Sequence, residues 1–195
     1  MLLSDLWLVQ RARQGDSGAF GKLFDRHGRR VYHLLRRLSG SQATAEDLTQ
    51  ETFLTAWQRL ESWKGRGALS TWLYGIAVNH WRTYRRSNPA PADSLSLPEN
   101  AELPSDDDQA DPLLHCTRAE LHRNLDAAIA TLPEVYREVF VLVRVEELSY
   151  QAVAELLDLP VGTVQSRLHR ATGLLRKALT STIFPEREKE NCHVL

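Results

Sequence analysis

Apolar residues recur at steps of three and four positions through most of the chain, which is the spacing of one buried face of an α-helix. Alternation of period two, which is typical of half-buried strands, is absent, and runs of β-branched residues are short. With their start and stop signals, the patterns predict helices at 6–12, 17–38, 41–60, 70–86, 121–132, 134–145, 149–157 and 161–179. The sequence therefore predicts an all-α fold with four helices in each half.

The chain of 195 residues changes composition near its middle. Between Asn88 and Pro112 it has five prolines, seven acidic residues and no basic or aromatic residue. Such a segment cannot bury enough apolar surface to offset the entropy lost on ordering. We therefore expect two small helical domains, 1–88 and 115–183, joined by a flexible acidic linker at 89–114 and followed by a tail at 184–195.

The net charge of −1 hides an uneven distribution along the chain. Residues 1–92 include 14 basic and 7 acidic residues, whereas residues 159–185 include four basic residues and no acidic one. Two basic regions on either side of an acidic segment favour a polyanionic partner.

Residues 148–171 read LSYQAVAELLDLPVGTVQSRLHRA. Two short amphipathic helices, the first with Ser149 as a plausible N-cap, flank a break at 158–160, and the second helix is basic. This pattern is typical of a helix-turn-helix whose second helix enters the major groove of duplex DNA, although a plain helical hairpin is the alternative. The candidate DNA-contacting residues, with Thr163 in the first turn and the others off the buried stripe, are Thr163, Gln165, Ser166, Arg167, His169 and Arg170.

Residues 63–86 combine cations with aromatic rings and include no acidic residue. Cations that follow phosphates and rings that stack on unpaired bases are what single-stranded DNA binding requires. The candidates are Lys64, Arg66, Arg82, Arg85 and Arg86, interleaved with Trp63, Trp72, Tyr74, Trp81 and Tyr84. A core helix is the alternative, because Trp72, Leu73, Ile76 and Ala77 are spaced as a buried stripe. We expect Trp81, Arg82, Tyr84 and Arg85 to lie beyond that stripe.

The helix that begins at Ser41 or Thr44 has two different faces. Its predicted apolar face consists of Phe53, Ala56, Trp57 and Leu60. Its polar face consists of Asp47, Gln50, Glu51 and Leu54. A solvated face is the ordinary interpretation, but Leu54 beside acidic residues in a basic domain suits the docking of a basic protein.

No catalytic pattern is visible, since the chain lacks a glycine-rich phosphate loop, HExxH, CxxC and a nucleophile elbow. We expect no enzyme activity and no cofactor. His115–Cys116 and Cys192–His193 could together supply four metal ligands, but the cysteines are 76 positions apart, so no metal site is expected. Without a membrane-spanning run, a signal peptide or a disulfide framework, the chain is expected in the cytoplasm.

Four stretches, in this order, resemble the extracytoplasmic-function (ECF) group of bacterial sigma factors in the sigma-70 family. The stretch GDSGAFGKLFDRHGRRVYHLLRRL resembles the opening of that family's N-terminal domain. The stretch AEDLTQETFLTAW resembles its polymerase-docking helix. Residues 63–79 resemble its promoter-melting segment. Residues 132–171 resemble its C-terminal domain, which reads the upstream promoter element.

The resemblance implies a non-catalytic factor that binds core RNA polymerase through the β′ clamp helices and the β subunit. It also implies binding to promoter DNA and to an anti-sigma factor, a stress-response role and no insertion into a membrane. The residues implied for polymerase contact are Asp47, Gln50, Glu51 and Leu54. For the single-stranded downstream element, the resemblance implies contact by Trp72 and by Asn79, which reads a flipped base. For the upstream element, it implies contact by Gln165, Ser166, His169 and Arg170.

The chain departs from the family pattern at Gln165, where Arg or Lys is frequent, and at 65–69, which is glycine-rich. Three other functions remain alternatives on the residues alone. A self-sufficient repressor or activator would need a dimer surface or a sensor pocket. A helical adaptor would need neither DNA-binding segment, and a metal-dependent enzyme would need a clustered site.

Overall fold

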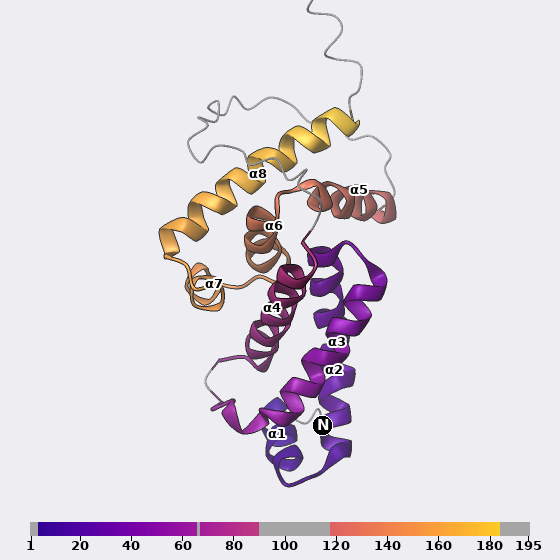
Figure 1. Cartoon of the computed structure of the whole chain (residues 1–195), viewed down its shortest axis with the longest axis vertical. Coiled ribbons are helices and arrows are strands. Elements are labelled where there is room, and N and C mark those ends of the chain that lie inside the picture. Colours follow the sequence, from indigo (N-terminus) through magenta and orange to yellow (C-terminus); the bar gives the residue numbers. More distant parts are fainter. Residues whose placement is uncertain (1–3, 66, 90–117, 184–195) are drawn as a thin grey trace, which may run out of the picture.

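The computed structural model describes residues 4–65, 67–89 and 118–183, with side chains described over 125–179 of the last range. The regular elements in these ranges are all helical, as predicted (Figure 1). The N-terminal half consists of α1 (Asp5–Arg13), α2 (Ser17–Ser39), α3 (Gln42–Gln58), the 3₁₀ turn η1 (Leu60–Ser62) and α4 (Leu69–Ser87). The C-terminal half consists of α5 (Arg118–Thr131), α6 (Glu134–Phe140), the π-helical turn η2 (Val141–Val145), α7 (Tyr150–Leu157) and α8 (Val161–Ile183).

The predicted linker, apart from Pro89, and the predicted tail lie outside the described residues. Among the helices that are described, none combines the length and the apolar character needed to cross a membrane.

Short polar side chains begin four of the helices. Ser4, Asp16, Ser41 and Ser149 each precede a helix and accept a hydrogen bond from a backbone N–H in its first turn. Ser41, rather than the alternative Thr44, therefore caps α3. The bond from the Ala19 N–H lowers the pKa of Asp16. These caps explain why the helix starts were readable from the sequence.

Three details of the predicted helices are wrong. Leu6, expected to be buried, is 50 % exposed, and Leu8 is buried instead. The reason is that Leu6 lies on the same side of α1 as Arg13, seven positions later, and Arg13 contacts η1. Trp57, expected on the apolar face of α3, is 38 % exposed. The predicted helix 134–145 changes to a π turn after Phe140, where the Glu146 N–H donates to the carbonyl of Val141, five positions back.

The long helix α2 is the centre of the N-terminal half. Helices α1, α3 and α4 all pack against it, and α3 also packs on α4. In the C-terminal half, α5, α6 and α7 pack on α8 (Figure 1).

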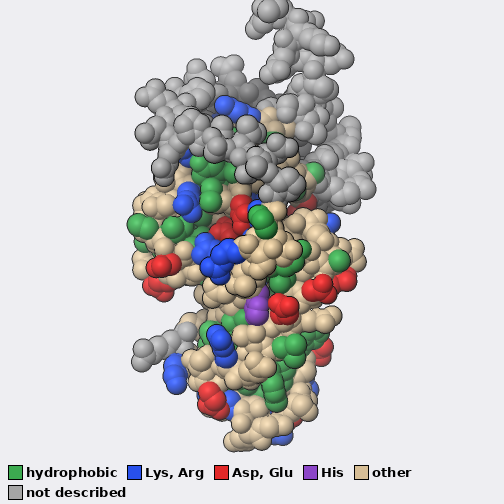
Figure 2. Space-filling view, in the orientation of Figure 1, with side chains coloured by type: hydrophobic (Ala, Val, Ile, Leu, Met, Phe, Trp, Pro, Cys, Tyr) green, Lys and Arg blue, Asp and Glu red, His purple; other side chains and the backbone are tan. Residues whose placement is uncertain are grey.

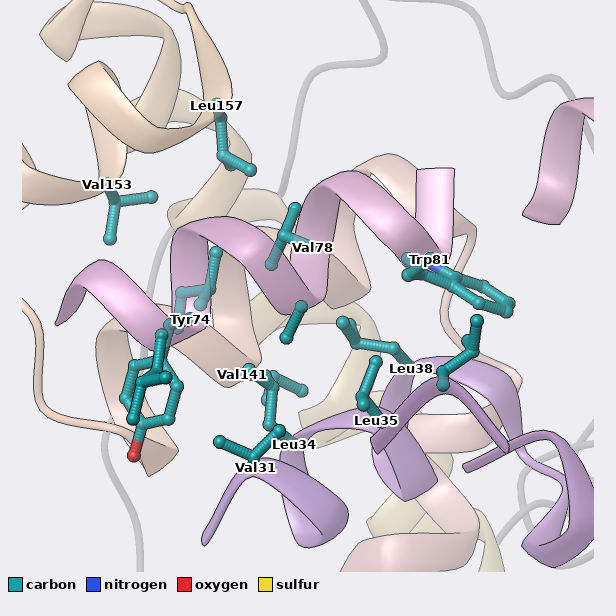
Figure 3. Packing of buried hydrophobic residues seen from close by; sticks show 14 of the residues in the cluster. Val31, Leu34, Leu35, Leu38, Tyr74, Val78, Trp81, Val141, Val153 and Leu157 are labelled. Carbon is teal, nitrogen blue, oxygen red and sulfur yellow. The ribbon is translucent and has the colours of Figure 1, made fainter. Parts of the chain in front are cut away.

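The two halves share a buried hydrophobic core. Val141 of η2 is fully buried. It lies beside Val31 and Leu34 of α2 and near Tyr74 of α4 (Figure 3). Helix α2 contacts α5, α6 and η2 along this boundary. In this arrangement the halves are therefore packed together rather than separate.

Two ion pairs join α4 to α6 beside this core. Arg82 binds Glu138 through Nε at 3.3 Å and Nη2 at 2.9 Å, and its Nη1 donates to the carbonyl of Leu157 at 3.2 Å. Arg85 donates to the Oε2 of Glu134 through Nε at 3.0 Å and Nη2 at 2.8 Å. We call these two ion pairs the clasp. Figure 2 shows basic and acidic side chains next to one another in the middle of this face of the molecule.

Two further polar contacts cross the same boundary. The Tyr74 hydroxyl donates to Glu146, and the pKa of Tyr74 is raised, first by burial and then by this bond, so the phenol stays protonated and remains a donor. The Nε of Arg37 donates to Asp126 at 3.0 Å. The boundary between the halves thus combines apolar burial with charged pairs.

The clasp can be tested with Glu138→Gln. Glu138 is buried, so the amide keeps the side-chain volume but removes the charge that pairs with Arg82. We expect the free energy of unfolding to fall by about 1–3 kcal/mol and the radius of gyration of the free chain to increase. Urea unfolding followed by circular dichroism and small-angle X-ray scattering measure the two effects.

Glu155→Gln is the matched control, because Glu155 is exposed and its hydrogen bond to Gln151 stays within α7. It should change neither quantity. Equal stability and equal radius of gyration in the two variants would contradict the role assigned to the clasp.

Candidate nucleic-acid and protein interfaces

Helices α7 and α8 form a helix-turn-helix in the C-terminal half. Asp158 ends α7 in the left-handed region, at φ +54°, and the Leu159 N–H donates back to the Ala154 carbonyl at 2.9 Å. The Thr163 N–H then donates to the Pro160 carbonyl at 2.9 Å and begins α8. The apolar residues that hold the two helices together are Val153, Leu157, Val164 and Leu168, all buried.

The first turns of α8 carry the residues proposed from the sequence to contact duplex DNA. Gln165, Ser166 and His169 are exposed. The remaining three, Thr163, Arg167 and Arg170, are half-buried. Polar side chains thus cover the outer face of the helix that a major groove would receive.

The segment between α3 and α4 is held at both ends by buried side chains. Trp63 precedes it and Leu69 follows it. Gly65 and Gly67 have φ of +74° and +77°, a conformation that residues with a Cβ rarely adopt, so glycine is needed at both positions. Lys64 is exposed in this segment, whereas Arg66 lies outside the described residues. We call residues 64–68 the basic loop.

One face of α4 continues from the basic loop. Trp72, Asn79 and Arg86 follow one another at intervals of seven positions, which is about two helical turns, so they lie on the same side of the helix. Asn79 and Arg86 are exposed and Trp72 is half-buried. We call these three residues the α4 polar face.

Trp81 does not lie beyond the buried stripe, contrary to the prediction. It is 4 % exposed, because it is nine positions, about two and a half turns, from Trp72 and so points to the opposite side. Its spacing of four from Ala77 was the signal that this prediction overlooked. Tyr84 stacks on it with ring centroids 6.0 Å apart and is itself partly exposed.

Arg82 and Arg85 are also placed differently from the prediction. Both guanidinium groups were expected to be available to phosphates, and both are engaged by the clasp. Their partners, Glu134 and Glu138, were not identified from the sequence, because no local pattern links positions about fifty apart. The segment 63–86 therefore divides into an open part, formed by Lys64 and the α4 polar face, and a part occupied within the molecule.

The acidic face of α3 is arranged as predicted. Asp47, Gln50, Glu51 and Leu54 are all exposed, and Leu54 is 63 % exposed. Glu51 lies 3.4 Å from the Nδ1 of His80 on α4.

Aromatic side chains that were not predicted to be part of this face border it. Phe24 of α2 is exposed and packs edge-on against Phe53, with ring centroids 4.8 Å apart. Trp57 packs edge-on against Phe20 at 4.9 Å. The exposure of Trp57 beside the acidic face widens the surface that is suited to a protein partner.

No cluster of three or more metal-ligating residues occurs in the part of the chain that the structure describes. His115, Cys116, Cys192 and His193 lie outside it.

Comparison with known proteins identifies two family regions in this chain. The model of Sigma-70 region 2 matches residues 23–89, and that of Sigma-70, region 4 matches residues 122–173. The first therefore includes α3, the basic loop and α4, and the second includes the helix-turn-helix.

Similar proteins match along nearly their whole length. The ECF RNA polymerase sigma-E factor of Haemophilus influenzae is 36 % identical, over 91 % of this chain and 96 % of that protein. The RNA polymerase sigma-H factor of Pseudomonas aeruginosa is 34 % identical, over 90 % of this chain and 93 % of that protein. The ECF RNA polymerase sigma factor SigW of Bacillus subtilis is 32 % identical, over 88 % of this chain and 94 % of that protein.

Two solved structures have a similar fold. The structure of CnrH in complex with the cytosolic domain of CnrY is 27 % identical, with a TM-score of 0.63, over 89 % of this chain and 96 % of that one. The sigma factor RpoE of Bartonella quintana, in complex with the anti-sigma factor NepR, is 23 % identical, with a TM-score of 0.62, over 83 % of this chain and 96 % of that one. With its two sigma-70 regions and these full-length relatives, the chain belongs to the extracytoplasmic-function sigma factors of the sigma-70 family, which direct promoter-specific initiation of transcription.

Proposed function

We propose that three surfaces of this sigma factor divide the work of initiation. The acidic face of α3 docks on the β′ clamp helices of core RNA polymerase. The basic loop and the α4 polar face bind the unpaired downstream promoter element. The outer face of α8 reads the upstream element as duplex DNA. The chain supplies promoter specificity to an enzyme and performs no catalysis of its own.

The α4 polar face is the observation that carries this proposal. Trp72 offers a ring for stacking, Asn79 offers an amide for a base edge, and Arg86 offers a cation for a phosphate, all on one side of one helix. Unstacking a base step costs a few kcal/mol, so an opened strand has to be captured by contacts of this kind. Asn79 is the residue we assign to the flipped base.

The outer face of α8 suits a closed duplex instead. Gln165 can pair with both edge groups of adenine, and Arg167 or Arg170 can contact a phosphate or guanine. Ser166 and His169 are exposed on the same outer surface. The proposal therefore assigns base readout to Gln165 and positioning to the arginines.

The arrangement of the two halves has a consequence for this function. The clasp engages Arg82 and Arg85, which flank the α4 polar face, and Arg82 also holds the end of α7 through the Leu157 carbonyl. We infer that the halves act as domains, 1–88 and 115–183, that separate along the linker 89–114 when promoter DNA is bound. Arg82 and Arg85 then become available to phosphates.

An anti-sigma factor is the second partner we propose. The CnrH relative was solved in complex with the cytosolic domain of CnrY, and the clasped arrangement offers a single surface formed by both halves. A protein that binds this arrangement would keep the arginines of α4 engaged. We place the protein with core polymerase in the bacterial cytoplasm.

Charge reversal at the acidic face tests polymerase docking. Asp47→Lys together with Glu51→Lys should weaken binding to core polymerase by at least tenfold, because paired charges in protein interfaces are worth about 2–5 kcal/mol when one partner is lost. Affinity is measured by titration of labelled sigma factor with core enzyme, and run-off transcription should fall in parallel. The control is Glu155→Lys, because Glu155 is an exposed acidic residue on α7, in the other half of the chain. Equal affinities of the variants would contradict the docking assignment.

Asn79→Ala tests recognition of the downstream element. The holoenzyme should still bind the upstream duplex, but promoter opening should fall by about tenfold, since a base-specific side-chain contact is worth about 1–3 kcal/mol. Permanganate reactivity of thymines reports the opening. Gln58→Ala removes an exposed side-chain amide from the end of α3 and should open DNA normally. Normal opening and unchanged base preference in Asn79→Ala would remove this role from Asn79.

Gln165→Ala tests the upstream contact in the same way. It should weaken holoenzyme binding to the upstream duplex by about fivefold or more and relax the base preference at one position. Gln151→Ala is the matched control, because Gln151 is an exposed amide on α7, the other helix of the motif. A base preference that is retained in full by Gln165→Ala would exclude direct readout by this residue.

A further inference from the structure

Two large apolar side chains on α1 are exposed and have no part in the surfaces described above. Leu6 is 50 % exposed and Trp7 is 39 % exposed. The other apolar residues of the helix, Leu8, Val9 and Ala12, are buried against α2, so the exposed pair is not needed to hold α1 in place.

Helix α1 is fixed beside the basic loop. Arg13 donates from Nη2 to the carbonyl of Leu60 at 3.0 Å and also to the carbonyl of Trp63, immediately before the loop. At the other end of the helix, a Cβ built on Gly65 would lie 3.7 Å from the Cδ1 of Leu6. Figure 1 shows the segment that joins α3 to α4 running alongside α1. Leu6 therefore borders the loop, and Trp7 is the next residue along the same helix.

The ring of Trp7 has a cation beside it, and the loop carries another. The guanidinium of Arg11 lies 5.3 Å from the centroid of the Trp7 ring and is held there by Asp16 at 2.7 Å. Lys64 is exposed in the loop.

The other acidic residues near α1 are also paired with cations. Asp5, at the start of α1, is paired with Arg26 and His27 on the α2 side. Glu61 lies 3.8 Å from the Arg13 Nε. An unpaired strand is bound by exposed aromatic rings and by cations, and here Trp7 supplies a ring on α1 and Lys64 a cation in the loop that α1 borders.

We propose that Trp7 stacks on one unpaired base of the promoter strand, next to the bases held by the basic loop and the α4 polar face. Leu6 covers the edge of that base, and Lys64 contacts a flanking phosphate. This inference rests on the proposed role of α4 in binding the opened strand. It adds α1 to the DNA-binding surface and makes Trp7 a determinant of affinity at one nucleotide position.

The test uses holoenzyme assembled from full-length chain and core polymerase, with single-stranded oligonucleotides that span the downstream element. In one oligonucleotide after another, a single base is replaced by an abasic site. For Trp7→Ala, we expect binding of the intact strand to weaken by about 5- to 100-fold, the range for loss of one stacked base. One abasic position should weaken binding by the wild type to a similar degree and have no further effect on Trp7→Ala. Trp7→Phe should recover most of the affinity.

Tyr150→Ala is the control, because Tyr150 is an exposed ring of the C-terminal half. Strand affinity should be unchanged in it. Circular dichroism and core affinity are measured for every variant, so that a misfolded or undocked protein is recognised.

The outcomes separate this inference from the proposed function. If wild-type holoenzyme binds the strand and Trp7→Ala binds it equally well at every position, the inference is wrong and the role of α4 stands. If Trp7→Ala weakens core affinity alone, the surface binds protein and the inference is also overturned. If wild-type holoenzyme has no affinity for the strand while docking normally, the assignment of α4 fails first.

Discussion

The buried carboxylate of Glu138 is the constraint on which the arrangement of the two halves depends. A buried charge needs a partner, and its partner is Arg82 from the other half of the chain. Because the pair is bidentate, it fixes the direction of α6 relative to α4 as well as their separation. Arg82 also holds the C-terminal end of α7, so the orientation of the helix-turn-helix follows from the same contact.

Helix α4 has three sides with different surroundings. One side, with Leu73, Ala77 and Trp81, is buried in the core. A second side carries the arginines of the clasp, and a third carries Trp72, Asn79 and Arg86. In the proposed function the clasp side borders the side that binds DNA, so that contact between the halves and binding of a promoter strand compete for neighbouring positions on one rigid element. In the proposed function, this competition couples the separation of the halves to DNA binding.

Local patterns in the sequence predicted the helices, the cap at Ser149, and the polar outer face of α8, and they narrowed the cap of α3 to Ser41 or Thr44, since these features depend on residues within one or two turns. They failed where distant residues decide. The engagement of Arg82 and Arg85 by Glu138 and Glu134 depends on how the two halves pack, which periodicity within one helix does not encode. Leu6 was misplaced for a similar reason, because its side of α1 faces the loop segment rather than α2.

The wrong prediction that Trp81 is exposed has a different cause. The spacing of Trp81 from Ala77 already indicated burial, but its neighbours Arg82 and Arg85 suggested a nucleic-acid surface. In a helix, adjacent positions point about 100° apart, so basic neighbours carry little information on the side that a ring occupies. The correct boundary between core and surface in α4 was therefore available from the sequence.

The central claim is that the halves are clasped in the free protein and separate on the promoter. Distances between spin labels at Gln58 and Glu155, both exposed and in different halves, test it directly by pulsed electron paramagnetic resonance, after Cys116 and Cys192 are replaced by serine. The account predicts one short distance for the free chain and a longer one after core polymerase and promoter DNA are added. The same distance in both samples, or a broad distribution in the free chain, would contradict it.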